Sequence, residues 1–363
     1  MSKNNSLTKA KSAKNDEFYT TYDAIQIELN HYEDKFENKV VFCNCDDPFE
    51  SNFAKFFLRN FNYLKLKRLF CTSYAGSPIT GKRLSLFDDY NEPVSSQHGY
   101  VLDITKVPMS NGRVVSDADI TTLLHQKGKV TRLKGNGDYA SDECLNYLTQ
   151  SDIVVTNPPF SKFRSYLATL IEYDKKFLII GNVNAITYKD VFPLIKENKI
   201  WLGVSHGGMS FKVPDNCPPR KMGYWVDDSG QKWRSMGNIE WFTNLDYSQR
   251  HEDLILYKRY NSKDFPDYDN YKAINVSKVA DIPLDYSGNM GVPITFLDKY
   301  SPDQFEILGI TDRQNTSGIR TKKYTVDDSK KYNDLNARGV VIKDGKYKAV
   351  YARILVRNKK VQE

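Results

Sequence analysis

The stretch from residue 151 to 163, SDIVVTNPPFSKF, holds side chains whose types and order could do chemistry. Its apolar IVV run predicts a short strand, followed by Asn157, Pro158, Pro159 and Phe160, and then by a helix. Pro158 fixes its own φ, and Pro159 restricts the residue before it, so the chain must leave the strand extended and stiff. We therefore expect the Asn157 amide oxygen and the Pro158 carbonyl to be two acceptors on one side of the chain.

Two adjacent acceptors can bind both hydrogens of a planar exocyclic amine, while the Phe160 ring stacks on the attached base. This arrangement predicts an enzyme that alkylates the amino group of a nucleobase. An ordinary turn is the competing interpretation, because Asn-Pro and Pro-Pro are common turn dipeptides. Placement after a strand favours a site, since ligands of open α/β sheets bind at the carboxyl ends of strands.

The elements that must position these residues alternate between strand and helix over about two hundred residues. Strands are expected at 39–45, 66–72, 100–104, 129–133, 153–155, 177–180 and 200–204. This alternation predicts an α/β fold with a doubly wound, mainly parallel sheet. The turn-rich segment 74–100 is expected to be an insertion.

The pattern changes after Gly207, where tryptophan-bearing segments predict antiparallel strands and Asp228-Ser229-Gly230 predicts a hairpin turn. Residues 254–257, LILY, predict a last buried strand. Beyond it, short strands and Gly/Pro turns predict an α+β C-terminal region. These changes divide the chain into a basic flexible arm (1–14), a main domain (15–260) and a C-terminal region (261–363).

Composition excludes several classes of protein. The 363 residues are 40% hydrophobic and carry a formal net charge of +7, which suits a folded protein with a polyanionic partner. No apolar run has membrane length and no signal peptide is apparent, so neither a membrane protein nor a secreted one is expected. Five scattered cysteines predict free thiols, no metal site and a cytoplasmic location.

Three loops at strand ends carry polar residues that should meet in space: Asp46-Asp47-Pro48, Asp138-Tyr139 and the loop that begins at Asn157. Together they predict a cofactor pocket, although helix capping explains Asp47 alone equally well. Acidic residues would repel a pyrophosphate, and no G-x-G-x-x-G or Walker motif is present. S-adenosylmethionine, which has no phosphate, is therefore the expected cofactor.

The chain resembles the EcoRI-type adenine-specific DNA methyltransferase family over about residues 14–357. The residues that carry the resemblance are DEFYT (16–20), CNCDDP (43–48), VTNPPFS (155–161), GVPITFLD (291–298) and FEILG (305–309). The resemblance implies a class I, Rossmann-like methyltransferase fold, with S-adenosylhomocysteine as product and double-stranded DNA as substrate. It makes 15–260 the catalytic domain and 261–363 the DNA target-recognition region.

The resemblance also implies roles for individual residues. The catalytic residues are Asn157, Pro158, Pro159 and Phe160, which hold a flipped-out adenine for methylation at its N6 amine. The cofactor-binding residues are Asp16, Phe18, Tyr19, Thr20, Cys45, Asp46, Asp47, Pro48, Asp103, Asp138 and Tyr139. Asp103 is included because the strand that ends at Thr72 lacks the acidic residue that often holds the ribose.

Basic residues of the arm and of the C-terminal region are the expected DNA contacts, with a solvated surface as the alternative for each. They are Lys11, Lys14, Arg313, Arg320, Lys322, Lys323 and Arg338. We expect a cytoplasmic monomer of bacterial or phage origin, paired with a restriction endonuclease or acting alone. Methylation of RNA or of a protein glutamine amide, and a catalytically dead DNA-binding module, are alternatives. The recognition sequence and the methylated base within it are not readable from the chain.

Overall fold

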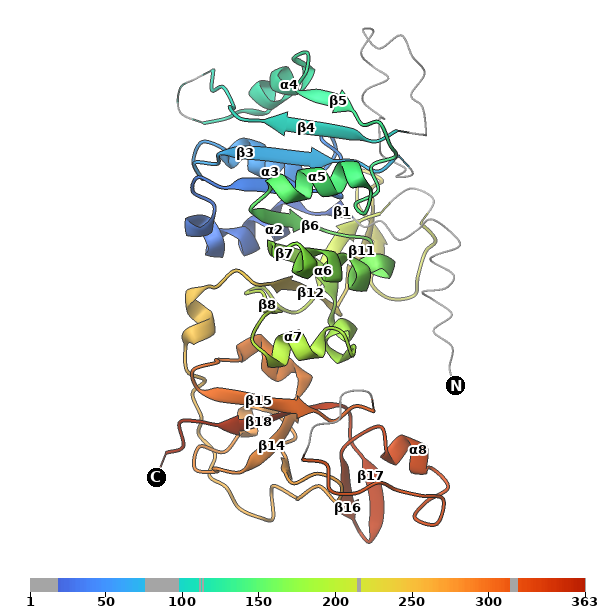
Figure 1. Cartoon of the computed structure of the whole chain (residues 1–363). Coiled ribbons are helices and arrows are strands. Elements are labelled where there is room, and N and C mark those ends of the chain that lie inside the picture. The colour runs from blue at the N-terminus through green and yellow to red at the C-terminus, as the bar shows by residue number, and fades with distance from the viewer. Residues whose placement is uncertain are drawn as a thin grey trace. The chain divides into compact units, whose positions relative to one another are not determined.

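The computed structural model describes residues 19–75, 98–110, 112, 114–213, 217–313 and 319–362 (Figure 1). The chain forms two compact units. The first comprises Met1–Val183 and Gly203–Leu245, and the second comprises Asn184–Leu202 and Asp246–Glu363. The predicted boundary near residue 260 falls inside the second unit.

One large sheet is the core of the first unit, with its strands in the order β5-β4-β3-β2-β6-β7-β12 (Figure 1). The strands are β2 (Val40–Cys43), β3 (Arg68–Thr72), β4 (Tyr100–Ile104), β5 (Val130–Arg132), β6 (Ile153–Thr156), β7 (Lys176–Asn182) and β12 (Ile239–Thr243). All residues of β2 and β6 are buried, so both faces of the sheet are covered at its centre.

The sheet is mixed, which corrects the prediction of a mainly parallel one. Its centre is parallel, since β2 pairs with β3 and β6, and β6 pairs with β7. Both flanks are antiparallel: β4 against β3, β5 against β4, and β12 against β7. Alternation of strands and helices does not fix strand direction, and the sequence signals no crossover helix between β3 and β4, as a parallel pair would need.

Four helices of this unit begin where a polar side chain satisfies the first backbone N–H groups. Thr21 caps α2, Ser51 caps α3, Ser116 caps α4 with a capping box, and Ser141 caps α5. The helices of this unit are α2 (Tyr22–Leu29), η1 (Asn30–Lys35), α3 (Asn52–Asn60), α4 (Asp117–His125), α5 (Asp142–Gln150), η3 (Phe160–Lys162) and α6 (Phe163–Glu172).

A small antiparallel sheet completes the first unit, in the order β1-β9-β11-β10. Its strands are β1 (Tyr19–Thr20), β9 (Met209–Lys212), β10 (Tyr224–Val226) and β11 (Lys232–Met236). The predicted hairpin joins β10 to β11, and Gly230 occupies its turn at φ +81°. Through β1, this sheet brings Thr20 next to the chain that follows β6.

The second unit is built on a sheet in the order β13-β14-β18-β15 and a hairpin of β16 and β17. Its strands are β8 (Trp201–Leu202), β13 (Ile274–Asn275), β14 (Asn289–Pro293), β15 (Phe305–Ile310), β16 (Val340–Lys343), β17 (Lys346–Ala349) and β18 (Arg353–Asn358). Its helices are α7 (Phe192–Lys196), η5 (Ser248–His251), η6 (Val279–Asp281), η7 (Ile294–Lys299) and α8 (Tyr332–Leu335), with η4 (Val183–Thr187) at the sequence boundary. No helix in the described part of the chain is long and apolar enough to cross a membrane.

The predicted buried strand at residues 254–257 is wrong. The segment belongs to no sheet, and Ile255 and Tyr257 are 70% and 79% exposed. A side chain takes the place of a neighbouring strand: Leu254 N donates to Gln304 Oε1 at 2.7 Å, and Gln304 Nε2 donates to Leu254 O at 2.9 Å. A four-residue apolar run does not show whether its backbone will pair with a strand or with a side chain.

A buried carboxylate fixes the segment that leads into β9. Glu28 Oε1 accepts hydrogen bonds from Tyr32 Oη at 3.0 Å and from Val204 N at 2.8 Å, and Oε2 accepts one from Ser205 N at 2.7 Å. Gly203 is required here because a Cβ would lie 2.2 Å from Glu28 Oε1. Glu28 therefore determines where β9, and with it the small sheet, begins.

Replacing Glu28 by alanine should strongly destabilise the protein, because two half-buried backbone N–H groups and the Tyr32 hydroxyl lose their buried acceptor. We expect the free energy of unfolding to fall by about 3 kcal/mol, measured by urea denaturation. Glu37→Ala is the matched control, since Glu37 is 62% exposed and pairs with exposed Lys65. The control should cost less than about 1 kcal/mol. Equal losses in the two variants would contradict the role of Glu28.

Candidate functional site

The tetrapeptide that begins at Asn157 follows β6 directly at its carboxyl end, as predicted. Pro158 is buried, whereas Asn157, Pro159 and Phe160 are half-buried. The turn is closed by Lys162 N, which donates to Pro159 O at 2.8 Å. The tetrapeptide thus lies partly exposed at the carboxyl ends of the central strands and not inside the core.

The Asn157 amide is oriented by a residue far away in the sequence. Its Nδ2 donates to Thr20 Oγ1 at 3.2 Å. This hydrogen bond fixes the orientation of the amide plane, so the amide oxygen faces away from Thr20. Thr20 is itself fixed, because it pairs with Phe211 in β9 and its carbonyl accepts a hydrogen bond from Asn52 Nδ2 at 2.7 Å. The Phe160 ring packs edge-on against Phe211, with centroids 6.3 Å apart.

Asp46 joins the loop after β2 to the end of β6. Its Oδ1 accepts a hydrogen bond from Ser51 Oγ, and its Oδ2 accepts one from Thr156 Oγ1, each at 2.6 Å. Burial raises the pKa of this carboxyl to about 6, although both hydroxyls act to lower it. Because protein groups hold both oxygens, Asp46 positions the residue that follows Thr156.

The rest of the CNCDDP loop is also held by its own contacts. Asp47 Oδ1 accepts hydrogen bonds from Phe49 N at 2.9 Å and from Glu50 N at 3.1 Å, which shapes the turn before α3. Ser51, and not Asp47, is the helix cap. Cys45 is half-buried and Pro48 is buried. The described residues contain no group of His, Cys, Asp or Glu side chains able to hold a metal ion.

The loop that holds Asp138 reaches the same place from the other side. Asp138 Oδ2 accepts from Lys162 Nζ at 3.0 Å, and this ammonium lies 5.4 Å from the centre of the Tyr139 ring. Burial acts to raise the pKa of Asp138, but the Ala140 N–H and Lys162 outweigh it and lower the pKa. The loop sits tightly on the sheet, since a Cβ on Gly137 (φ +75°) would lie 2.0 Å from Ser73 O.

Aromatic rings link the loop that holds Asp138 and Tyr139 to the CNCDDP loop. Tyr139 Oη shares a hydrogen bond with Ser165 Oγ at 2.8 Å, and its ring lies 5.0 Å from that of Tyr166. Tyr166 Oη in turn donates to Asn44 Oδ1. The three loops predicted to converge are therefore joined through hydrogen bonds and ring contacts.

Asp103 does not lie with the other predicted site residues. Its carboxylate forms a bidentate ion pair with Arg68, at 2.7 and 2.6 Å. Because β4 runs antiparallel to β3, Asp103 pairs with Phe70, and Val101 lies opposite Thr72 at the carboxyl end. The Asp103 carboxylate thus contacts Arg68 at the start of β3, away from the loops at the carboxyl ends of β2 and β6.

The other predicted residues divide into those outside the described residues and those in the second unit. Lys11, Lys14, Asp16 and Phe18 lie outside the described residues. In the second unit, Arg313 and Arg320 donate to the backbone carbonyls of Asn333 and Asn336, and Lys322 pairs with Asp269 at 3.1 Å. Lys323 and Arg338 are exposed.

The sequence did not single out several residues that build the site. Thr156, Ser51 and Asn52 hold Asp46 and Thr20, and Lys162 holds Asp138. The one available signal was position, because Thr156 and Lys162 flank the tetrapeptide.

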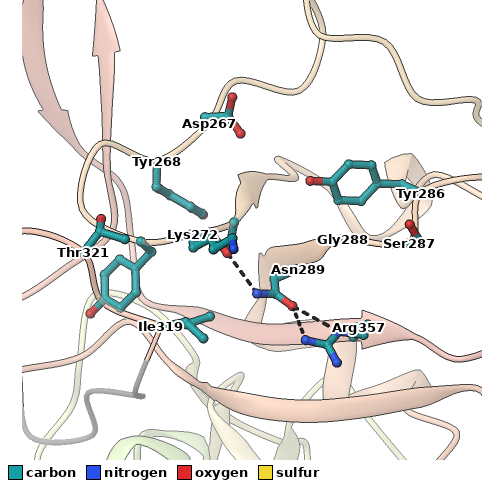
Figure 2. Close-up of a pocket in the computed structure, with 12 residues that line it drawn as sticks. Asp267, Tyr268, Lys272, Tyr286, Ser287, Gly288, Asn289, Ile319, Thr321 and Arg357 are labelled. Carbon is teal, nitrogen blue, oxygen red and sulfur yellow. Dashed lines mark hydrogen bonds between the residues drawn. The ribbon is translucent and has the colours of Figure 1, made fainter.

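The second unit contains a separate pocket of about 880 Å³. Figure 2 shows Asn289 at its base, where Nδ2 donates to Lys272 O at 3.0 Å and Oδ1 accepts from Arg357 Nη2 at 2.9 Å. Tyr268, Tyr271 and Tyr286 also line it. Its lining residues include both acidic and basic side chains and several hydroxyl groups. They do not include an Asn-Pro-Pro-Phe sequence like the one at Asn157.

The raised pKa of Asp46 predicts a dependence of stability on pH that the Asp46→Asn variant lacks. In the unfolded chain this carboxyl ionises near 3.8, whereas in the folded chain it ionises at about 6. Between these values the folded state holds an additional proton, so stability falls as the pH rises through this range. Relative to the variant, the wild type should lose about 3 kcal/mol of unfolding free energy between about pH 4 and pH 7.

Urea denaturation of both proteins at several pH values measures this difference. Asp142→Asn, at an exposed carboxylate, controls for the loss of one surface charge. A constant difference between wild type and Asp46→Asn across the range would contradict the prediction.

Comparison with known proteins gives one consistent result. The family model described as adenine-specific methyltransferase EcoRI matches residues 6–359. The Type II methyltransferase M.EcoRI of Escherichia coli is 45% identical over 99% of this chain and 98% of that protein. The Type II methyltransferases M.MgeORF184P of Mycoplasma genitalium and M.MpnI of Mycoplasma pneumoniae are 37% and 36% identical, each over 83% of this chain and 85% and 84% of their own lengths. No solved structure matches. The chain therefore belongs to the EcoRI family of adenine-specific methyltransferases.

Proposed function

We propose that this protein is a site-specific DNA methyltransferase that transfers a methyl group from S-adenosylmethionine to the N6 amine of an adenine flipped out of double-stranded DNA. One observation carries the proposal: the Asn157 amide is fixed by Thr20 at the carboxyl end of β6, beside Phe160. The names of the relatives support the same activity, since each is a Type II methyltransferase.

The residues at the strand ends fit S-adenosylmethionine. The acidic loops of Asp47 and Asp138 suit a ligand that bears an ammonium and a sulfonium, and they disfavour one that bears phosphates. Tyr19, Thr20 and Tyr139 would complete the wall of the pocket, with Asp16 and Phe18 as further candidates. Asp46 supports this wall from behind. When bound, the cofactor supplies a methyl group on a positively charged sulfur. The class I, doubly wound arrangement of the catalytic domain is part of this proposal.

The chain's own groups orient the amine. With Nδ2 held by Thr20, the Asn157 oxygen and the Pro158 carbonyl accept the two amine hydrogens of the adenine. This draws electron density onto the nitrogen and directs its lone pair away from both acceptors. Phe160 stacks on the base. No strong base is required before transfer, because the proton leaves from an already cationic nitrogen. Positioning of this kind supplies much of an enzyme's rate enhancement.

DNA recognition is assigned to the second unit and to the basic arm. Lys323 and Arg338 are exposed in the second unit and remain candidates for DNA contact. A cytoplasmic monomer that works with a restriction endonuclease, or alone, completes the proposal.

A methyltransferase of RNA or of a protein glutamine amide is the second candidate, because the tetrapeptide can hold any planar amine. A steep fall of binding affinity with salt concentration would indicate a nucleic acid rather than a protein substrate. Methyl transfer to unmethylated plasmid would then distinguish DNA from RNA. Mapping of methylated adenines in DNA from expressing cells then gives the target sequence.

The Asn157→Ala variant should bind S-adenosylmethionine with unchanged affinity but transfer methyl groups at least about a hundredfold more slowly, because one of the two acceptors is lost. Calorimetry measures the first quantity, and incorporation of radioactive methyl into unmethylated plasmid measures the second.

The control is Asn146→Ala, which removes an exposed amide from α5. Wild-type transfer by the Asn157 variant would refute the proposed role. Lack of transfer by the wild-type protein on DNA, with transfer to RNA or peptide, would support the second candidate.

A further inference from the structure

The β16–β17 hairpin of the second unit, beside α8 in Figure 1, ends in a tight turn. Lys343 lies opposite Lys346, and only Asp344 and Gly345 join them. Both turn residues have positive φ, +51° and +69°. A two-residue turn of this kind matches the twist of paired strands, so the hairpin is a short ribbon of defined shape. Its tip, residues 342–348, is exposed throughout.

The root of the hairpin is packed on both faces. Successive residues of a strand point to opposite faces. Val340 packs against Tyr324 on one face, and Val341 packs against Tyr268 on the other. Both valines are buried. The root therefore holds the tip in a fixed direction, while the side chains of the tip extend into solvent.

One face of the tip carries three lysines. Opposite residues of paired strands share a face, and alternate residues of a strand return to it. Lys343, Lys346 and Lys348 therefore point to the same side, which we name the lysine face. Asp344 is the single acidic residue of the tip, so the tip carries a net charge of +2, three lysines less one aspartate.

The other face of the tip is supported by its own unit. Tyr347 Oη accepts a hydrogen bond from Lys322 Nζ at 3.1 Å, and the Tyr347 ring lies 5.2 Å from that of Tyr324. Lys322 also pairs with Asp269 at 3.1 Å. Lys322 is thus committed inside the unit, whereas no acidic side chain among the described residues forms an ion pair with the lysine face. The lysine face is the one open to a ligand.

We propose that the tip of this hairpin binds the target DNA in its major groove through the lysine face. This inference rests on the proposed function and assigns DNA contact to one element of the second unit. The major groove of B-form DNA, about 12 Å wide, admits a two-stranded ribbon, whereas that of duplex RNA is too narrow. There the three ammonium groups contact acceptor atoms of phosphates and of guanine edges.

The double variant Lys343→Gln/Lys346→Gln should bind a duplex that contains the mapped methylation site about tenfold more weakly than wild type. The slope of log affinity against log salt concentration should shrink by about 1.8, or about 0.9 for each lost cation. Lys127→Gln, which removes an exposed lysine before β5 in the first unit, should change neither quantity. Fluorescence anisotropy measures both. An unchanged slope in the double variant would overturn the inference.

A thiol trap locates the contact in one groove. Lys346→Cys places a thiol on the lysine face, and the duplex carries a disulfide-forming tether on cytosine N4, in the major groove, or on guanine N2, in the minor groove. We expect cross-linking through the major-groove tether at a few neighbouring positions of the site. Lys127→Cys is the control, since the chain's own cysteines are buried or half-buried.

The inference fails if Lys346→Cys cross-links only through the minor groove, not at all, or no more than Lys127→Cys does. Unchanged binding of S-adenosylmethionine by the double variant shows that the cofactor site is intact. Failure of the wild-type protein to methylate DNA would refute the proposed function itself. Normal methylation by the wild type, with a wild-type salt slope in the double variant, would refute only this inference.

Discussion

A buried carboxylate joins the ends of the two central strands, and the geometry of the site depends on it. Asp46 accepts hydrogen bonds from the hydroxyls of Ser51 and Thr156, which belong to the start of α3 and the end of β6. The contacts then close into a ring. Thr156 precedes Asn157, Asn157 donates to Thr20, the Thr20 carbonyl accepts from Asn52, and Asn52 follows Ser51. No member can move without straining its neighbours.

This ring explains why the small antiparallel sheet is part of the candidate site. Thr20 can hold Asn157 only if β1 is in place, and β1 is held by pairing with β9. Glu28 fixes the segment that leads into β9. The rigidity of the tetrapeptide therefore has two sources. Two prolines restrict the backbone, whereas the side-chain amide is oriented by a strand 137 residues earlier in the sequence.

Local patterns predicted what local forces determine. The strand before Asn157 and the polar loops at strand ends were both readable, because propensity and alternation act over a few residues. The antiparallel flanks, the ion pair of Asp103 and the exposed segment 254–257 were not. Each depends on which distant segment lies alongside, and hydrophobic periodicity carries no such information. The bond between Thr20 and Asn157 belongs to this second group, although both residues had been singled out separately.

The distribution of charge around Asn157 bears on how the proposed cofactor would be oriented. Carboxylates lie along the inner loops: Asp47 Oδ1 accepts from the backbone N–H of Phe49, and Asp138 accepts from the Ala140 N–H and from Lys162. The small sheet contributes Thr20, whose hydroxyl accepts the hydrogen bond from Asn157 Nδ2. Under the proposed function, the carboxylates beside the strand ends favour a sulfonium donor at the inner loops, and Asn157 lies where these loops meet β1 of the small sheet.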